Sequence, residues 1–242
     1  MSTLTIMAMA VAVLAGAVTM RVTGMGFSLV AAPFLVLAMG PLEGVLVANL
    51  CGTASALLNL TQLHRDVDWR RASWLAPAGL VGVLLGALTV HRLPVPVLAV
   101  VVSVMVLVGL LITTLGNRAT LPPSPVVAGA AGLASGFMTA TAAVGGPALV
   151  IYALATRWPQ ARFAATAQLY FAVLGTAAVV QLGGPPSLTL PGWLVLAAAL
   201  TLGLVAGNVL ARHLDGRQAL RLVIAVATIG ALLTLAQGLR AL

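Results

Sequence analysis

Two long apolar stretches of this chain are interrupted in the same way, and these interruptions constrain the fold more than any other feature. The first stretch, residues 4–39, is broken at Thr23-Gly24-Met25-Gly26 and contains Pro33 further along. The second, residues 125–156, contains two glycines and a proline at 145–147. Irregular backbone at membrane depth has amide and carbonyl groups that lipid cannot satisfy, so it is tolerated only inside protein or beside a wet cavity. The two breaks therefore predict an internal cavity.

The composition places the chain in a membrane. Hydrophobic residues make up 61% and charged residues 7% of the chain, whereas a soluble domain carries about 25% charged residues. Apolar runs leave no stretch long enough for a separate soluble domain, so we expect one polytopic unit. The net charge of +8 comes from arginines in short loops between apolar runs. Positive-inside topology explains that pattern, so nucleic acid is not expected as a partner.

Six further stretches are long enough for a full crossing, which needs about 20 apolar residues for roughly 30 Å of hydrocarbon. They lie near residues 43–62, 73–91, 95–115, 161–181, 191–211 and 217–237. The two interrupted stretches are longer than one crossing. Each predicts either one long kinked helix or a hairpin of two shorter segments.

The arginines separate these alternatives, because a hairpin returns the chain to its starting side and a single crossing does not. Leaving out Arg21 at the first break, single crossings place five arginines on one side and six on the other. Hairpins place nine on one side and two on the other, which is a strong bias. We therefore predict two hairpins, with both termini outside the cytoplasm. The loops at 62–72, 116–124, 157–162 and 212–217 then lie inside it.

The two halves of the chain repeat each other. Four residues of the first half reappear 121 positions later with the two basic residues exchanged: Gly82, Gly86, His91 and Arg92 become Gly203, Gly207, Arg212 and His213. Each half holds an odd number of crossings plus a hairpin, so the second half is inverted. We expect an all-α polytopic membrane protein with two inverted repeats, each a broken-helix hairpin plus three transmembrane helices. Residues 1–120 and 121–242 form these repeats, which together make one membrane domain.

The breaks predict a binding site for an anion. A helix that begins after each break points its free amides, with their partial positive charge, at the cavity. Hydroxyl and amide side chains near the breaks add neutral hydrogen-bonding groups. Close helix packing is the alternative explanation for each single residue. The candidate substrate-binding residues are Thr23, Gly24, Gly26, Ser28, Pro33, Asn49, Thr53, Thr139, Thr141, Gly145, Gly146, Pro147, Thr166 and Gln168.

Other polar residues carry weaker signals. The loop from His64 to Asp68 matches no metal-ligand spacing, and we expect its acids to pair with nearby arginines. Glu43 begins a crossing and is either an interfacial residue or a protonatable coupling group. Gly82, Gly86 and their repeats predict close helix packing, with a sliding surface as the alternative. No catalytic motif, metal site or cofactor site is recognised, so we do not expect an enzyme.

The segment from Thr23 to Phe34 resembles the first glycine-rich segment of the TauE/SafE family of membrane permeases. Residues 145–149 and the pattern of Gly82, Gly86 and Arg92 are similar to that family as well, so the resemblance extends over essentially the whole chain. It implies a permease that moves small sulfur-containing anions, such as sulfite, sulfoacetate or thiosulfate, often outward across bacterial plasma membranes. The family often has a denser glycine cluster at the first break, which Met25, Phe27 and Ser28 interrupt here.

Taken together, the sequence predicts a multi-pass carrier in the bacterial plasma (inner) membrane that exports a small anion, such as a sulfur oxyanion or organosulfonate, by alternating access. Its expected partners are the small anionic substrate and the lipid bilayer. A coupling proton or other ion, and a homo-oligomer, are left open. An anion channel is the alternative mechanism, and a non-transporting membrane scaffold subunit is the alternative of a different class.

Overall fold

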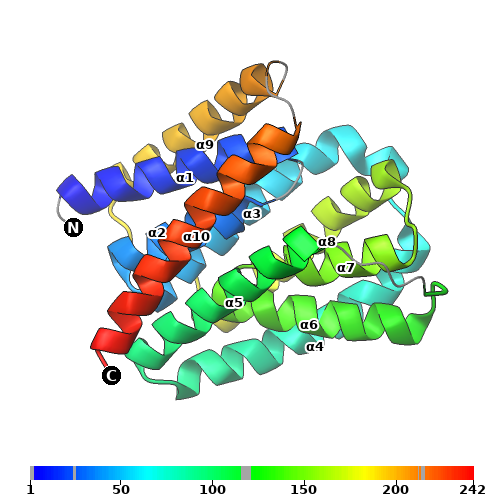
Figure 1. Ribbon diagram of the computed structural model, residues 1–242, viewed down its shortest axis with the longest axis horizontal. Helices are drawn as coiled ribbons and strands as arrows, with labels where there is room; N and C mark the ends of the chain where they lie inside the picture. Colours follow the sequence, from blue (N-terminus) through cyan, green and yellow to red (C-terminus); the bar gives the residue numbers. More distant parts are fainter. Residues whose placement is uncertain (1–2, 24–25, 116–120, 212, 214–215) are drawn as a thin grey trace.

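The protein is a bundle of helices with two broken segments at its centre (Figure 1). The computed structural model describes residues 3–23, 26–115, 121–211, 213 and 216–242. In chain order the helices are α1 (Thr3–Thr23), α2 (Phe27–Met39), α3 (Pro41–Leu63), the 3-10 turn η1 (His64–Asp66), α4 (Trp69–Arg92), α5 (Val95–Leu115), α6 (Pro125–Ala142), α7 (Gly146–Ala155), α8 (Gln160–Gln181), α9 (Leu190–Leu210) and α10 (Gly216–Arg240).

The helices confirm the class of an all-α polytopic membrane protein. In the described part of the chain, 7 helices are long and apolar enough to cross a membrane. Five of these are predicted crossings, namely α3, α4, α5, α8 and α9, and the other two are α1 and α6. The sixth predicted crossing corresponds to α10, whose apolar part is Ile224–Arg240. The two shortest helices, α2 with 13 residues and α7 with 10, follow the two breaks.

Both interrupted stretches fold back on themselves. A Cβ atom added at Gly16 in α1 would lie 2.9 Å from the Cβ of Ala31, so α2 returns along α1. The backbone amide of Leu121, before α6, donates to the carbonyl of Ala155 at the end of α7 at 2.8 Å. Both stretches are therefore hairpins of two helices rather than single kinked helices.

The molecule has two distinct ends (Figure 1). At one end, Arg71 Nη1 donates to Thr156 Oγ1 at 2.9 Å and the Asp68 amide donates to Thr166 Oγ1 at 2.9 Å. We call this the arginine-rich end; it contains residues 64–71, 121–125 and 155–162. The opposite end, which we call the terminal end, contains both termini and residues 40–43, 91–95 and 181–190. There the Ser187 hydroxyl donates to Glu43 Oε1 at 2.9 Å.

The first helix of each hairpin packs in parallel against a helix of the other half. In the α4–α6 pair, a Cβ atom at Gly82 would collide with the carbonyl oxygen of Leu133. A Cβ atom at Gly86, one turn later, would lie 2.8 Å from the carbonyl oxygen of Phe137. Contacts advance together along both helices, so these helices are parallel. Glycine here lets the backbones approach more closely than any side chain allows.

The α1–α9 pair repeats this arrangement. A Cβ atom at Gly203 would lie 2.7 Å from the carbonyl oxygen of Leu14, and one at Gly207 would lie 3.0 Å from that of Val18. The glycines that recur in the sequence therefore serve close packing in both halves. Because α1 starts at the terminal end and α6 at the arginine-rich end, the two hairpins enter the bundle from opposite ends (Figure 1).

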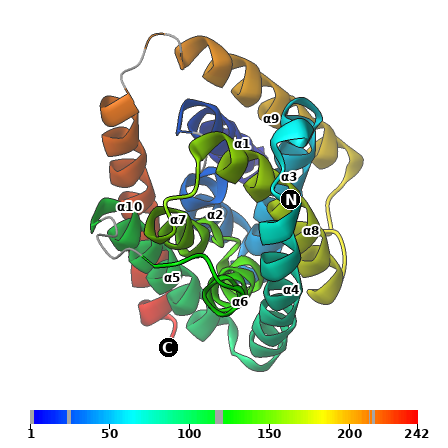
Figure 2. The ribbon, with the colours of Figure 1, turned by 90° about the vertical axis from the view of Figure 1, so that its right-hand side faces the viewer.

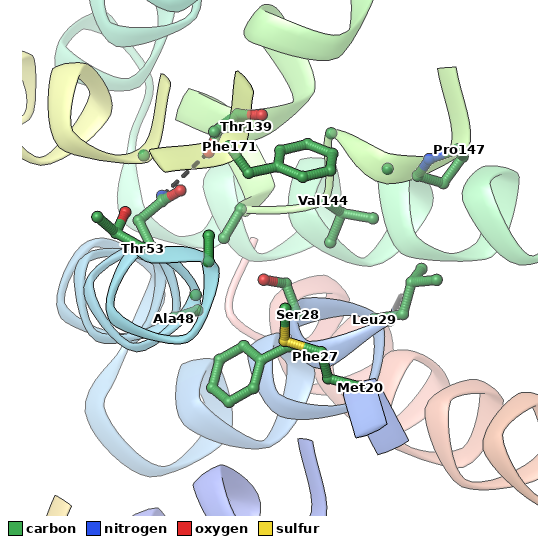
Figure 3. A pocket seen from close by; sticks show the side chains of 18 of the residues that line it. Met20, Phe27, Ser28, Leu29, Ala48, Thr53, Thr139, Val144, Pro147 and Phe171 are labelled. Atoms are coloured by element: carbon green, nitrogen blue, oxygen red, sulfur yellow. Dashed lines mark hydrogen bonds between the residues drawn. The ribbon is translucent and has the colours of Figure 1, made fainter. Parts of the chain in front are cut away.

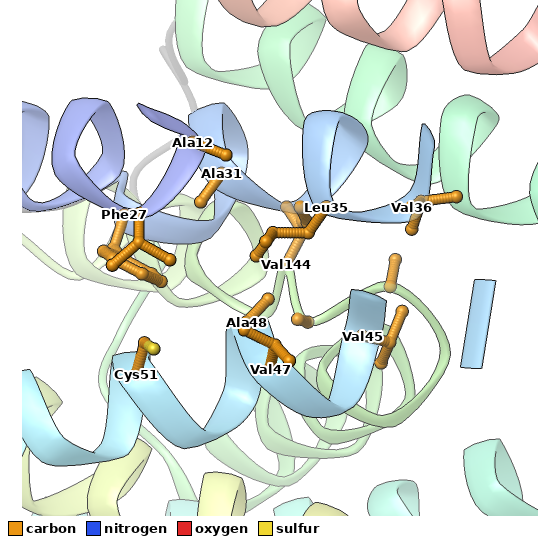
Figure 4. Close-up of a cluster of buried hydrophobic side chains, with 14 of the residues drawn as sticks. Ala12, Phe27, Ala31, Leu35, Val36, Val45, Val47, Ala48, Cys51 and Val144 are labelled. Carbon is orange, nitrogen blue, oxygen red and sulfur yellow. The ribbon is translucent and has the colours of Figure 1, made fainter. Parts of the chain in front are cut away.

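A buried apolar cluster joins the two hairpins. Helix α2 lies between α1 and α3, and its Leu35 is fully buried near Val47 and Ala48 of α3 (Figure 4). Val144, at the tip of the second hairpin, belongs to the same cluster. The tip of one half is thus part of the core of the other half. Seen from the arginine-rich end, α2, α7 and α6 occupy the middle of the bundle (Figure 2).

The tight α4–α6 contact predicts a difference between two alanine substitutions in the same helix. A Cβ atom at Gly136 would overlap the carbonyl of Gly79, whereas one at Gly129 meets nothing within 4 Å. Gly136→Ala is expected to destabilise the protein by about 1–3 kcal/mol, the usual cost of overpacking. Gly129→Ala is expected to be neutral or stabilising, because alanine favours helix over glycine. Thermal unfolding in detergent measures both, and equal stability of the two variants would contradict the packing.

Candidate functional site

A cavity of about 210 Å³ lies where the two hairpin tips meet (Figure 3). The first turn of α2 and the first turn of α7 form opposite parts of its wall, as the positions of Leu29 and Pro147 show. Helices α3, α6 and α8 contribute the rest of the polar lining, including Thr53 of α3 and Thr139 of α6. The cavity therefore draws on both halves of the chain and on both breaks.

Helix α2 presents an uncapped N-terminus to the cavity. The preceding residue, Gly26, has φ 110°, a left-handed conformation that favours glycine. Among the described residues, no side-chain cap is made at this helix end. Gly26, Phe27, Ser28 and Leu29 all line the cavity, and the Ser28 hydroxyl points toward its centre (Figure 3). The first amides of a helix have no partner within the helix, so an uncapped end carries partial positive charge.

Helix α7 presents a second uncapped N-terminus. It follows Ala143, whose φ is 59°, and Gly145, which makes no side-chain cap. The Gly145 carbonyl accepts a hydrogen bond from the Ser135 hydroxyl at 2.7 Å, which fixes the turn to α6. Gly145, Gly146 and Pro147 line the cavity. Two helix N-termini from opposite hairpins thus face one space, and both favour negative charge there.

Helices α3 and α8 add neutral polar groups. Asn49 Nδ2 donates to the carbonyl oxygens of Val45 and Thr139, each at 3.1 Å. Gln168 is 4% exposed, and its Oε1 has no hydrogen-bond partner among the described residues. In the same part of the chain, the buried Thr53 Oγ1 lacks a partner as well. Buried polar atoms are nearly always hydrogen bonded, so unpaired ones in a cavity wall indicate a place for a ligand or water.

The remaining lining is apolar, and none of the described lining residues is charged. These residues were not predicted: Met20, Phe27, Leu29, Ala48, Gly52, Ala56, Leu110, Ala143, Val144, Val150, Phe171, Gly175 and Ile224. For some of these residues, the sequence does contain a pattern from which the prediction could have been made. In α8, Phe171 and Gly175 follow Gln168 at helical spacing and so share its face.

Nine of the predicted site residues come together in this cavity, namely Gly26, Ser28, Asn49, Thr53, Thr139, Gly145, Gly146, Pro147 and Gln168. Three others, Thr141, Thr166 and Pro33, do not line it. The Thr141 hydroxyl donates to the Phe137 carbonyl in its own helix at 2.8 Å. Thr166 lies at the arginine-rich end, where it accepts the Asp68 amide. The side chain of Thr23 and all of Gly24 lie outside the described residues.

Pro33 also lies away from the cavity and has a packing contact instead. Its carbonyl oxygen accepts a hydrogen bond from the Thr234 hydroxyl of α10 at 3.1 Å. A Cβ atom at Gly230 would lie 3.1 Å from the Cβ of Pro33. Pro147 has the matching contact in the other half, since a Cβ atom at Gly109 of α5 would lie 2.8 Å from its Cγ. Both prolines therefore pack on a glycine, but only Pro147 reaches the cavity.

The charged candidates lie at the ends of the bundle. Asp68 pairs with Arg71 at 3.7 Å, as expected for this loop, and the guanidinium of Arg71 lies 4.5 Å from the Trp158 ring centroid. Glu43 accepts hydrogen bonds from the Ser187 hydroxyl and amide at the terminal end. In the described part of the chain no group of three His, Cys, Asp or Glu residues is arranged to hold a metal.

Comparison with known proteins assigns the chain to a family. The family model described as "Sulfite exporter TauE/SafE" matches residues 8–235, which include most of the first hairpin, all of the second and every residue of the cavity wall. Searches of curated proteins and of solved structures find no match. The family match spans nearly the entire chain, and it agrees with a membrane bundle whose broken helices meet at an internal cavity. The chain belongs to the sulfite exporter TauE/SafE family of membrane transporters.

Proposed function

We propose that this chain is a secondary transporter that exports a small sulfur oxyanion or organosulfonate, such as sulfite, by alternating access. The observation that carries the proposal is the meeting of two uncapped helix N-termini at one uncharged cavity. Membership of the sulfite exporter TauE/SafE family supports the sulfur-anion class. The candidate residues that line the cavity are the proposed substrate contacts.

Electrostatics supports an anion of low charge. A helix N-terminus is equivalent to roughly half an elementary positive charge, so two of them balance about one negative charge. The described lining supplies no fixed cation that would hold the anion more tightly. Ser28 and the amide side chains supply neutral hydrogen bonds, which orient the oxygens of a sulfonate or sulfite. Such a site binds and releases its ligand readily, as a carrier requires.

The arrangement of the two halves supports alternating access. We propose that residues 1–120 and 121–242 are inverted repeats, because each contributes a hairpin that enters from its own end and packs on the fourth helix of the other half. Transporters built from inverted repeats expose a central site to either side by rocking one part against the other. The cavity between the hairpin tips occupies the position that such a mechanism requires.

The arginine distribution supports an orientation in the bacterial plasma membrane. We propose that the arginine-rich end faces the cytoplasm and that both termini lie outside, in accordance with the positive-inside tendency. In a Cys51→Ser background, Leu242→Cys is expected to react with a membrane-impermeant maleimide in cells whose outer membrane is permeabilised and whose plasma membrane is intact. Arg65→Cys is expected to react only after the plasma membrane is opened. The reverse pattern would contradict the orientation.

Transport by purified protein in liposomes tests the function. Sulfite flux is expected to saturate with concentration and to be accelerated by sulfite on the opposite side, because a carrier returns faster when loaded. A channel would pass sulfite without saturation or counter-transport, and a scaffold subunit would pass none. A panel of sulfite, thiosulfate and sulfoacetate, measured with and without a pH gradient, identifies the preferred anion and any coupled proton.

Substitution of Ser28 tests the anion site directly. Ser28→Ala removes one hydrogen bond to a charged ligand and is expected to weaken sulfite binding by about tenfold. Ser28→Asp places a carboxylate in the cavity and is expected to abolish transport. Its fold is expected to remain, because an acidic residue is favourable at a helix N-terminus. Ser103→Ala is the matched control, since Ser103 is buried in α5 outside the cavity wall. Retained transport by Ser28→Asp would argue against an anion at this position.

A further inference from the structure

We infer that Asn49 and Gln168 are alternating positioning residues, each of which ties the tip of the opposite hairpin and closes the cavity toward one end of the protein. This inference adds residues to the proposed alternating access. It rests on that proposal in one respect, because it requires the protein to have a second conformation. Three observations carry it: the correspondence between the halves, the hydrogen bond of Asn49, and the Gln168 side chain, which lines the cavity with its amide oxygen buried and unpaired among the described residues.

The packing contacts show which residues of α1 and α6 occupy equivalent positions in the two halves. Gly82 faces the carbonyl oxygen of Leu133, and its counterpart Gly203 faces that of Leu14. The next pair of glycines faces the carbonyl oxygens of Phe137 and Val18. Leu14 and Leu133 are therefore equivalent, as are Val18 and Phe137, and the two residues of each pair are 119 positions apart in the sequence. The same separation relates Asn49 in α3 to Gln168 in α8.

By this correspondence, Thr139 at the tip of the second hairpin is equivalent to Met20 at the tip of the first. Asn49 Nδ2 donates to the carbonyl oxygen of Thr139 at 3.1 Å. The corresponding bond would join the Gln168 amide to the carbonyl oxygen of Met20. Instead, Met20 and Gln168 both line the cavity, and the Gln168 side chain, whose Oε1 is buried, makes no hydrogen bond with a described residue. The cavity therefore lies where the second bond would form.

The two positions lie at different depths in the bundle. Asn49 is the ninth residue of α3, which begins at the terminal end. Gln168 is the ninth residue of α8, which begins at the arginine-rich end. The formed bond thus closes the cavity toward the terminal end, and the unformed one leaves it wider toward the arginine-rich end. Figure 3 shows Thr139 with its hydrogen bond on one side of the cavity and Met20 on the other.

The exchange of partners follows from this geometry. When the first hairpin tip moves toward α8, the Gln168 amide reaches the carbonyl oxygen of Met20 and closes the arginine-rich side. When the second tip leaves α3, Asn49 releases Thr139 and the terminal side opens. One hydrogen bond changes a population ratio by roughly two- to tenfold, which biases two states without trapping either.

A single reporter cysteine tests the exchange without any substrate. Ala56 lines the cavity on α3, in the half of that helix nearer the arginine-rich end. In a Cys51→Ser, Ala56→Cys protein in detergent, the rate of reaction with a bulky maleimide reports opening toward that end. Asn49→Ala is expected to lower this rate by roughly two- to tenfold, because it removes the bond of the observed state. Gln168→Ala is expected to leave the rate unchanged or raise it, and the double variant to lie between the two.

Three comparisons separate this role from general damage. Asn59→Ala removes a buried amide of the same helix outside the cavity wall and is expected to leave labelling unchanged. Asn49→Gln retains an amide and is expected to recover part of the rate. Thermal unfolding identifies any variant that fails to fold. Equal changes in the same direction for Asn49→Ala and Gln168→Ala would overturn the exchange.

The outcome also distinguishes the exchange from the proposed function. If labelling shifts as expected while liposomes pass no sulfite or related anion, the exchange stands and the proposed cargo is wrong. If sulfite is transported and the two alanine variants label like the parent protein, the exchange is wrong and the proposed function stands.

Discussion

The structure depends on a requirement of the lipid environment: every backbone amide and carbonyl must find a partner or be shielded by protein. Two helices of this bundle stop and restart at membrane depth, so their loose ends must be enclosed. The glycines of α4 and α9 allow this enclosure, because they let the hairpin of the opposite half lie directly against a helix backbone. The close packing at these glycines therefore helps to enclose the ends of the broken helices within the protein.

The enclosed ends create a site that is polar without being charged. Helix dipoles are fixed in place by packing, whereas an arginine or lysine side chain would need space and a counter-charge. The cavity wall also presents the Thr53 hydroxyl and the Gln168 amide oxygen, which have no partner among the described residues. A ligand or water can supply these partners. The anion that we propose for this site would be selected by size and hydrogen bonding more than by charge strength.

Much of the architecture could be predicted from sequence because it depends on length and polarity. The crossings, the two hairpins and the separation of arginine-rich loops from the termini all follow from apolar runs and charge counts. The direction in which a residue points does not follow from these quantities. Pro33 and Pro147 each follow a break in the chain, yet Pro33 packs on α10 and only Pro147 lines the cavity. Thr166 and Gln168 lie two residues apart on α8 and so face different directions.

The differences between the halves carry as much information as their similarity. If both halves were identical in sequence, the conformations closed at either end would have equal free energy. Here the α3 position is asparagine and the α8 position is the longer glutamine, and their hairpin partners are Thr139 and Met20. The shorter amide holds its hairpin tip closely, whereas the longer one spans more space and has more rotamers to restrict. Under the proposed exchange of partners, such a difference favours closure at the terminal end in the unloaded protein, which would leave the cavity wider toward the arginine-rich end.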